Sequence, residues 1–575
     1  PSNSSAASDV YKRQRQGGLR IYTTLDLGWQ QVAEEAVRYR LRQLSEDPEA
    51  PSGRRIDNAA LVALDPRSGD ILALVGSPDY FDPRIDGAVN ATVATRQPGS
   101  SIKPITYAAA FDPNRAERPL TAATMMVDVR TSFTTREGDP YVPRNYDRQW
   151  RGPVLLRQAL ASSYNLVAVK VLDFVGIEAM TGLARSMGIT TFDDADRWGL
   201  ALTLGGGEVR LLELTAAYGA FANGGRRVEP VTIARVEDSR GRVLKAGKTT
   251  PGPRVMDERV AYLITDILSD NFARTPTFGE NSALRLSRPA AVKTGTTTDW
   301  RDNWTVGYTP NLVVGVWTGN ADNEPMYHVS GVTGAAPIWH DVMETLHKGQ
   351  PVREFVRPPG MVRVEVCADS GLLPASKATT TPETERRVRC PRTVEELFIA
   401  GTEPTRTDDW HREYALDVRN GLLAGPDCPP EFVTRAQYTL YPAEAQDWVR
   451  WNHVPHPPEE YSPLCPAASS TDLPPRGGET AILIMTSPDQ GSRYRLAVEI
   501  PRSAQKIPVA ARPLKGVSLR QVTLLVDGQP LVTLSAPPYQ ALWPMEVGSH
   551  TFASVGVDGD GNVVEGNSVT VEVVE

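Results

Sequence analysis

The sequence changes from strand-like to helical at Arg-Gln-Pro-Gly-Ser-Ser-Ile-Lys-Pro, residues 96–104. Gly99 and Ser100 are typical of a helix entrance, and Pro104 falls in the first turn, where a missing N–H costs little. Ser100 and Lys103 share one helical face, which places an amine beside a hydroxyl. A hydroxyl becomes a nucleophile when a base removes its proton, and burial or nearby positive charge lets a lysine do so. This stretch is therefore a candidate nucleophilic site, although alone such a pattern is more often a capping serine followed by a surface lysine.

A second polar group interrupts an apolar segment at Ser163-Tyr164-Asn165. The surrounding pattern predicts one helix over residues 155–174, so Ser163 and Asn165 would lie in its interior. Serine and asparagine are poor helix formers there, and buried polar side chains need partners or a cleft. The alternative is that both side chains bond back to the carbonyls of their own helix.

A third group, Lys293-Thr294-Gly295-Thr296-Thr297, follows the apolar residues 290–292. Gly295 weakens a strand unless something must approach its backbone closely, as an extended peptide would. Lys293 supplies charge for a carboxylate, and Thr294 and Thr296 supply hydroxyl donors. The alternative is an edge strand with a bulge.

Alternation and apolar periodicity predict an α+β fold, with a sheet flanked by helices and a helical block inserted. We expect strands at 19–25, 59–64, 71–75, 290–296, 303–308 and 312–318, and helices at 26–44, 155–174, 208–223, 257–271 and 337–346. The predicted division is a non-native leader at 1–14, a strand–helix linker at 15–57, a catalytic domain at 58–349, a Pro-rich connector at 350–478 and an all-β sandwich at 479–575.

All four cysteines, Cys367, Cys390, Cys428 and Cys465, lie in the C-terminal part. Their spacing lacks a CxxC pair, so a zinc site is not expected. Disulfides Cys367–Cys390 and Cys428–Cys465 would suit an oxidising compartment, although sequence alone does not fix the pairing and four unpaired thiols remain open.

The net charge of −8 argues against nucleic acid as a main partner. A membrane span is not expected, because no run of 18 apolar residues occurs. Residues 9–14 can be encoded by a transposase end used in sequencing libraries. We therefore expect the natural protein to begin near Arg15 and to lack its N-terminal part here.

The order Ser-x-x-Lys, Ser-x-Asn, Lys-Thr-Gly is far more specific than its parts. With it, the sequence resembles the transpeptidase domain of class A, bifunctional penicillin-binding proteins over roughly residues 16–345. The resemblance extends to Leu-Gly-Gly-Gly-Glu-Val at 204–209 and Trp-Thr-Val-Gly-Tyr at 304–308, and the region after 479 is similar to the immunoglobulin-like domain of some members. The family's glycosyltransferase domain and membrane anchor have no counterpart in this sequence. We expect an anchor in the parent protein.

The resemblance implies a penicillin-binding/β-lactamase-like fold and an extracytoplasmic DD-transpeptidase that cross-links peptidoglycan stem peptides, needs no cofactor or metal and is acylated by β-lactams. It assigns catalysis to Ser100 as nucleophile, Lys103 as base, Ser163 as proton relay and Lys293 as its charged partner. Substrate binding falls to Asn165, Thr294, Gly295 and Thr296, and the oxyanion hole to the N–H groups of Ser100 and Thr296. Tyr164 departs from the Asp of the Ser-Asp-Asn pattern, at a position that varies in the family. Cell-wall synthesis partners could bind the C-terminal domain.

Several other functions are alternatives to a transpeptidase, some with the same acyl-enzyme chemistry and some without it. A β-lactamase or DD-carboxypeptidase would share the acyl-enzyme, and a β-lactam receptor would acylate once and signal. Metal hydrolases fit poorly, because the histidines are scattered beyond residue 327 and form no His-x-x-x-His pair. No Gly-x-Ser-x-Gly surrounds a plausible nucleophile either, which disfavours a Ser-His-Asp hydrolase.

Overall fold

The structure is a computed structural model of the 575-residue chain. It describes residues 18–47, 53–115, 118–135, 140–247, 251–375, 385–465, 483–488, 493–496, 506–513, 519–537, 539–559 and 561–574. The predicted leader at 1–14 lies outside these residues. Among the described helices, none has both the length and the apolar character that a bilayer span requires.

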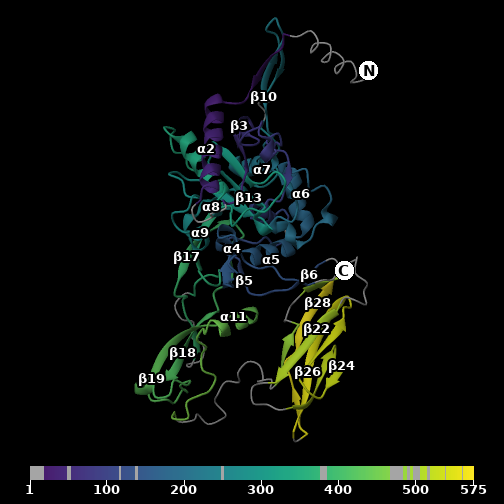
Figure 1. The fold of residues 1–575 in the computed structure, drawn as a ribbon. Helices are drawn as coiled ribbons and strands as arrows, with labels where there is room; N and C mark the ends of the chain where they lie inside the picture. The colour runs from purple at the N-terminus through teal and green to yellow at the C-terminus, as the bar shows by residue number, and fades with distance from the viewer. Residues whose placement is uncertain are drawn as a thin grey trace.

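A five-stranded antiparallel sheet forms the centre of the fold (Figure 1). Its strand order is β12 (Ala291–Thr296), β13 (Asp302–Tyr308), β14 (Val313–Gly319), β2 (Asn58–Leu64) and β3 (Ile71–Val75). Every residue of β2, β13 and β14 is buried, because helices cover both faces. The predicted hairpin at 59–75 and the three later strands are confirmed within one or two residues.

Two apolar clusters lie on the two faces of this sheet. One contains residues of α2 (Leu27–Ser45) and α10 (Ala335–His347). The other holds the helical block between β3 and β12, in which α3 is buried along its whole length. This block contains α3 (Lys103–Phe111), α4 (Leu156–Ala161), α5 (Asn165–Val175), α6 (Ile177–Met187), α7 (Leu211–Ala222), α8 (Glu258–Ser269) and α9 (Asn271–Phe278).

Short strand pairs lie mostly within the same stretch between β3 and β12. β1 (Arg20–Thr23) pairs with β10 (Ile233–Glu237), which pairs with β11 (Val243–Ala246). The remaining pairs are β4 (Thr95–Arg96) with β9 (Val209–Arg210), β5 (Met125–Asp128) with β8 (Gly152–Leu155), and β6 (Phe133–Thr134) with β7 (Pro140–Tyr141).

The region at 350–478 holds more regular structure than its proline content indicates. β15 (Met361–Cys367) pairs with β17 (Thr393–Ile399), while β18 (His411–Asp417) lies between β16 (Glu385–Arg387) and β19 (Val433–Thr439), and α11 (Gln446–Trp451) follows. Both disulfides, Cys367–Cys390 and Cys428–Cys465, are confirmed, which rules out four unpaired thiols. These cross-links restrict the unfolded chain and stabilise a segment with few apolar residues.

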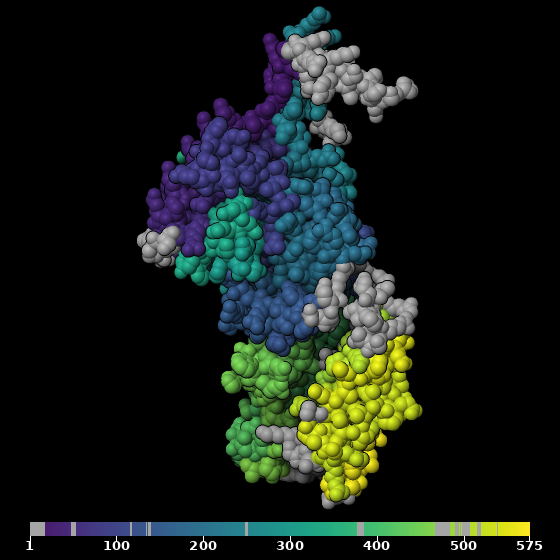
Figure 2. Space-filling view, turned by 45° about the vertical axis from the view of Figure 1, so that its right-hand side comes forward, coloured from purple at the N-terminus to yellow at the C-terminus, as the bar shows by residue number. Residues whose placement is uncertain are grey.

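The C-terminal region is built of strands around its own apolar core. One sheet contains β20 (Leu483–Ser487), β22 (Lys506–Pro513) and β25 (Tyr539–Pro544). The second contains β21 (Arg493–Arg495), β23 (Leu519–Val526), β24 (Gln529–Leu534), β26 (Gly548–Asp558), β27 (Val563–Glu565) and β28 (Val569–Val574). In the space-filling view these yellow strands form a separate body beside the green segment, which itself abuts the blue helical block (Figure 2).

Candidate active site

The first motif is held by backbone-to-backbone contact with β12. A short 3-10 turn, Gly99–Ile102, leads into α3, which begins at Lys103 with Pro104 in its first turn. Gly99 has a φ of 54°, and a Cβ there would lie 2.7 Å from the backbone nitrogen of Thr296. A Cβ on Gly295 would lie 2.1 Å from the carbonyl oxygen of Pro98. Glycine is therefore required at both positions, because any side chain would push the nucleophile turn off the strand.

The Leu-Gly-Gly-Gly stretch at 204–207 packs against the backbone of the same turn. A Cβ on Gly205, whose φ is 92°, would lie 2.2 Å from the nitrogen of Gly99. Main chain thus contacts main chain on two sides of Ser100, which fixes its place relative to β12.

The second motif lies in a turn, so the single helix predicted over 155–174 is wrong. The helix ends at Ala161, Ser163 adopts a left-handed φ of 63°, and α5 begins at Asn165. The apolar pattern continues across the break, because α4 and α5 both bury one face in the same core. The Asn145 side-chain oxygen accepts the Asn165 N–H (2.8 Å), which caps the new helix.

Tyr164, the residue that departs from Asp, is buried beneath a cation. Its side chain is 3% exposed, and the Arg151 guanidinium lies 4.5 Å from the centre of its ring. The middle position of this motif is therefore filled by a buried ring that packs against Arg151.

Two buried lysines converge on the Ser163 hydroxyl. Lys293 Nζ donates to Ser163 Oγ at 2.8 Å, and Lys103 Nζ lies 3.3 Å from the same oxygen. Lys103 also donates to the Ser163 carbonyl (2.8 Å) and to Asn165 Oδ1 (2.7 Å). The turn at Ser163 is what makes this possible, because it aims the hydroxyl and the carbonyl into the same space.

Burial makes both amines weak bases. It lowers the pKa of Lys103 well below its usual value, the neighbouring Lys293 charge lowers it further, and Asp128 opposes the shift. Burial lowers the pKa of Lys293 to about 7, with the charge of Arg274 acting in the same direction. An amine held neutral near neutral pH can accept a proton.

Asn165 joins the site to a buried carboxylate. The Nδ2 group of Asn165 donates to the Arg144 carbonyl, so both ends of the amide have partners within the protein. Asn145 donates to Asp128 (2.7 Å), which is fully buried and whose pKa burial raises to about 6. Because the Asn145 side chain also accepts the Asn165 N–H, it links the Asp128 carboxylate to the start of α5.

The three motifs meet at a cleft of ≈ 350 Å³. Ser100, Ser163, Asn165, Thr294 and Thr296 line it, while Lys103 and Lys293 lie beneath and Gly295 packs on the nucleophile turn. Thr296 Oγ1 accepts the N–H of Gly331 (2.9 Å), which leaves its own proton for a ligand. All the residues predicted from the sequence are thus brought together.

The sequence reasoning missed the rest of the lining. These residues come from two loops, from the turn between α4 and α5 and from the end of α9, and no local motif marks them: Asn145, Tyr146, Asp147, Arg151, Ser162, Tyr164, Pro276, Thr277, Phe278, Ser330 and Val332. The loop residues carry no periodicity, and nothing in the helical pattern of α9 marks its last residues as cleft lining, so only the fold identifies them.

Two groups of metal-ligand residue types occur in the part of the chain that the structure describes, both away from the cleft. One joins Cys367 to Asp408 and His411, the other Asp417 to Cys428 and Cys465. The cysteines in both are disulfide-bonded and offer no thiolate, so neither group has the donor set of a zinc site.

Replacing Gly295 with alanine should slow acylation by about tenfold or more, because displacing the nucleophile by a fraction of an ångström is costly. The added methyl would overlap Pro98, which precedes the Ser100 turn. The measurement is the rate of covalent labelling by a fluorescent penicillin. The matched control is Gly199→Ala, where no atom lies within 4 Å and φ is −108°. Equal rates in both variants would contradict this prediction.

Residues 59–344 match the family "Penicillin binding protein transpeptidase domain", and residues 357–413 match "Penicillin-binding protein 1A, C-terminal domain". Among curated relatives, penicillin-binding protein 2D of Bacillus subtilis is 36% identical over 394 residues, covering 67% of this chain and 52% of that protein. Penicillin-binding protein 1A of Neisseria lactamica is 34% identical over 347 residues, covering 57% and 42%. The chain thus spans about half the length of these relatives.

Solved structures show the same fold. Penicillin-binding protein 1A from Haemophilus influenzae aligns with a TM-score of 0.56 at 23% identity, covering 71% of this chain and 77% of that one. PonA1 from Mycobacterium tuberculosis aligns with a TM-score of 0.51 at 23% identity, covering 65% and 94%. With its motifs, its fold and two consecutive family matches in agreement, the chain belongs to the penicillin-binding proteins and carries their transpeptidase domain.

Proposed function

We propose that this chain is the transpeptidase part of a peptidoglycan cross-linking enzyme, acting through a Ser100 acyl-enzyme. The observation that carries the proposal is the Ser163 hydroxyl, which lies between two buried amines at the edge of the cleft that Ser100 lines. Such an arrangement can take a proton from one oxygen and return it to a leaving group, as acyl transfer requires.

In the first step Ser100 Oγ attacks the carbonyl carbon of the penultimate D-alanine. Lys103 takes the hydroxyl proton, and the N–H groups of Ser100 and Thr296 stabilise the oxyanion. The peptide C–N bond then breaks. The proton passes from Lys103 through Ser163 to the departing amine, and free D-alanine leaves the acyl-enzyme.

The donor peptide lies along β12 in this proposal. Thr294 and Thr296 bind the terminal carboxylate, and Gly295 lets the peptide backbone approach the strand. Lys293 contributes positive charge and holds the Ser163 hydroxyl, while Asn165 orients the substrate amide. Because the Asn165 amide already bonds Lys103 and Arg144, substrate binding shares or replaces one of these bonds.

In the second step an amine of another stem peptide attacks the acyl carbonyl and forms the cross-link. Penicillin acylates Ser100 in the same way and leaves slowly. A β-lactamase needs a base that activates water, but Asp147 is the one carboxylate among the described cleft-lining residues and it is paired with Arg151. This pairing favours a long-lived adduct over rapid hydrolysis.

The cellular setting follows from the same assignment. Two disulfides suit an oxidising, extracytoplasmic compartment. In the parent protein we expect a membrane anchor outside this chain, and the C-terminal strands offer a surface for cell-wall synthesis partners.

The test follows the fate of the acyl group. The protein is incubated with a D-Ala-D-Ala donor peptide and an amine acceptor, and products are identified by mass spectrometry. We expect the cross-linked product, and with penicillin a one-to-one adduct that persists. Release of the hydrolysed donor alone would indicate a carboxypeptidase, and rapid, repeated turnover of nitrocefin would indicate a β-lactamase; either result would overturn the proposal.

A further inference from the structure

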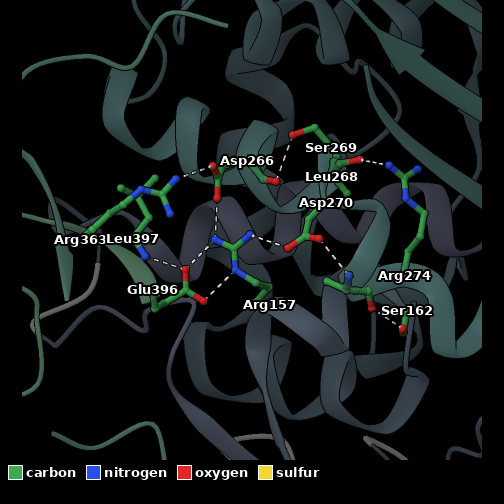
Figure 3. A network of polar contacts seen from close by, with 11 residues as sticks. Arg157, Ser162, Asp266, Leu268, Ser269, Asp270, Arg274, Arg363, Glu396 and Leu397 are labelled. Atoms are coloured by element: carbon green, nitrogen blue, oxygen red, sulfur yellow. Dashed lines mark hydrogen bonds and ion pairs between the residues drawn. The ribbon is translucent and has the colours of Figure 1, made fainter. Parts of the chain in front are cut away.

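A buried guanidinium connects the Ser163 turn to the segment after residue 350. Arg157, on α4, contacts three carboxylates: Asp266 on α8, Asp270 between α8 and α9, and Glu396 on β17 (Figure 3). β17 belongs to the stretch that matches the 1A-type C-terminal domain. All the residues that line the candidate active site lie outside this stretch.

Glu396 is a fixed partner for that guanidinium. Its side chain is 1% exposed, and it accepts two bonds from Arg157, at 2.7 Å from Nε and 2.6 Å from Nη2. The N–H of Leu397 donates to the same carboxylate (2.7 Å). Leu397 and Ile399, on the same strand, are part of the apolar core of the helical block. A bidentate pair on a strand packed in this way has little freedom to move.

Contacts lead from Arg157 to Ser163 by two routes. One is α4 itself, which ends two residues before Ser163. The other runs through Asp270, which bonds Arg157 Nη1 (3.2 Å) and accepts the N–H of Ala273 (2.9 Å). The Ala273 carbonyl then accepts the hydroxyl of Ser162 at 2.9 Å. Ser163 has a left-handed backbone that costs energy, so its neighbours must hold it in place.

The same contacts place a charge beside Lys293. Asp270 caps α9, and the next residue after Ala273 is Arg274, which is 4% exposed. Its guanidinium donates to the carbonyls of Leu268 (3.1 Å) and Leu284. The charge of Arg274 contributes to the lowered pKa of Lys293. Moving α9 would therefore change both the position and the electrostatics of the site.

We propose that β17 positions the Ser163 turn through the Glu396–Arg157 pair, so that acylation of Ser100 depends on the segment at 357–413. Glu396 and Arg157 are positioning residues, since neither touches the substrate. The inference rests on the proposed function, because it concerns the same acyl-enzyme.

The test is Glu396→Gln in the full chain. Glutamine keeps the shape of the side chain, and Arg157 keeps Asp266 and Asp270 as partners, so folding should persist. We expect the acylation rate at saturating fluorescent penicillin to fall by about tenfold, because small displacements of reacting groups are costly. The half-saturating concentration should stay unchanged, because the strand that binds the carboxylate is not altered.

The matched control is Glu413→Gln, which removes a similar bidentate pair. Glu413 on β18 accepts two bonds from Arg386 on β16, both at 2.9 Å, and both residues belong to the same segment. This variant should acylate at the unmodified rate. Thermal unfolding of both variants separates a loss of folded protein from a slower reaction.

Coupling is tested with the double variant Glu396→Gln, Ser162→Ala. If both changes act through Ala273, the double variant should be no slower than the slower single variant, since residues on one path are not additive. Independent effects in the double variant would assign the coupling to α4 itself, whereas unchanged acylation in Glu396→Gln, with or without a lower melting temperature, overturns the inference. Failure of the unmodified protein to take up label would instead refute the proposed function.

Discussion

Ser100→Ala should abolish covalent labelling by fluorescent penicillin, a loss of at least about 10⁴-fold in rate. The methyl group of alanine has no oxygen to attack the β-lactam carbonyl, and no other hydroxyl occupies its place at the start of α3. The fold should be retained, because main chain closes the turn, through the Ser100 carbonyl, which accepts the Lys103 N–H, and through the close packing of the glycines at 99, 205 and 295. Labelling is measured on gels and the adduct by intact mass.

The neighbouring serine is the matched control. Ser101 is fully buried and donates to the Pro98 carbonyl (2.7 Å), so Ser101→Ala removes a hydroxyl from the same turn without touching the cleft. We expect it to keep its label. Label that survives in Ser100→Ala, or that is lost in both variants with the fold intact, would refute the nucleophile assignment.

Lys103→Met should slow acylation by about 10²- to 10⁴-fold, the usual contribution of a general base. Methionine fills a similar volume and removes the desolvation cost of a buried amine, so the variant should fold although the bonds to Ser163 and Asn165 are lost. Lys170→Met is the matched control, because its amine donates to the Val127 carbonyl and pairs with Glu444 but does not reach the cleft. A rate for Lys103→Met within twofold of the control would contradict the base assignment.

The pH profile reports the same lysine. Lys103 accepts a proton only when neutral, so the acylation rate should rise with pH through its pKa and level off well below 10.5. The charged and titratable groups that act on it are Lys293, which lowers its pKa, and Asp128, which raises it. Asp128→Asn should therefore move the rising limb to lower pH. A limb that stays in place would exclude Asp128 as a charge felt by the base.

The parts of the site that follow from local sequence were predictable. The Ser100–Lys103 spacing needs only a helix start, and the β12 strand needs only an apolar run ending in Lys-Thr-Gly, and both form as expected. The neighbours β2–β3 and β12–β13–β14 follow from apolar runs that succeed one another along the chain, but the pairing of β14 with β2 joins segments far apart in the sequence and no local pattern indicates it.

Long-range contacts decided what the sequence could not indicate. The break at Ser163 depends on Asn145, whose side chain caps α5 from a loop 20 residues earlier. The partners of Arg157 come from positions more than 100 residues away. No local pattern therefore indicates that Glu396 pairs with this guanidinium. The same holds for the predicted connector at 350–478. Its regular structure comes from strand pairs and disulfides between residues that are not neighbours in the sequence.

The glycine contacts around Ser100 also bear on antibiotic resistance. Under the proposed function, the three glycines pack main chain against main chain beside Ser100, so they offer no side chain that one substitution could change to admit the natural peptide while rejecting a drug. Discrimination between the two must therefore be adjusted elsewhere in the cleft lining, at Tyr146 and Val332 in loops and at Phe278 at the end of α9. Selection under a β-lactam should enrich changes at and around these three positions and leave the glycines untouched.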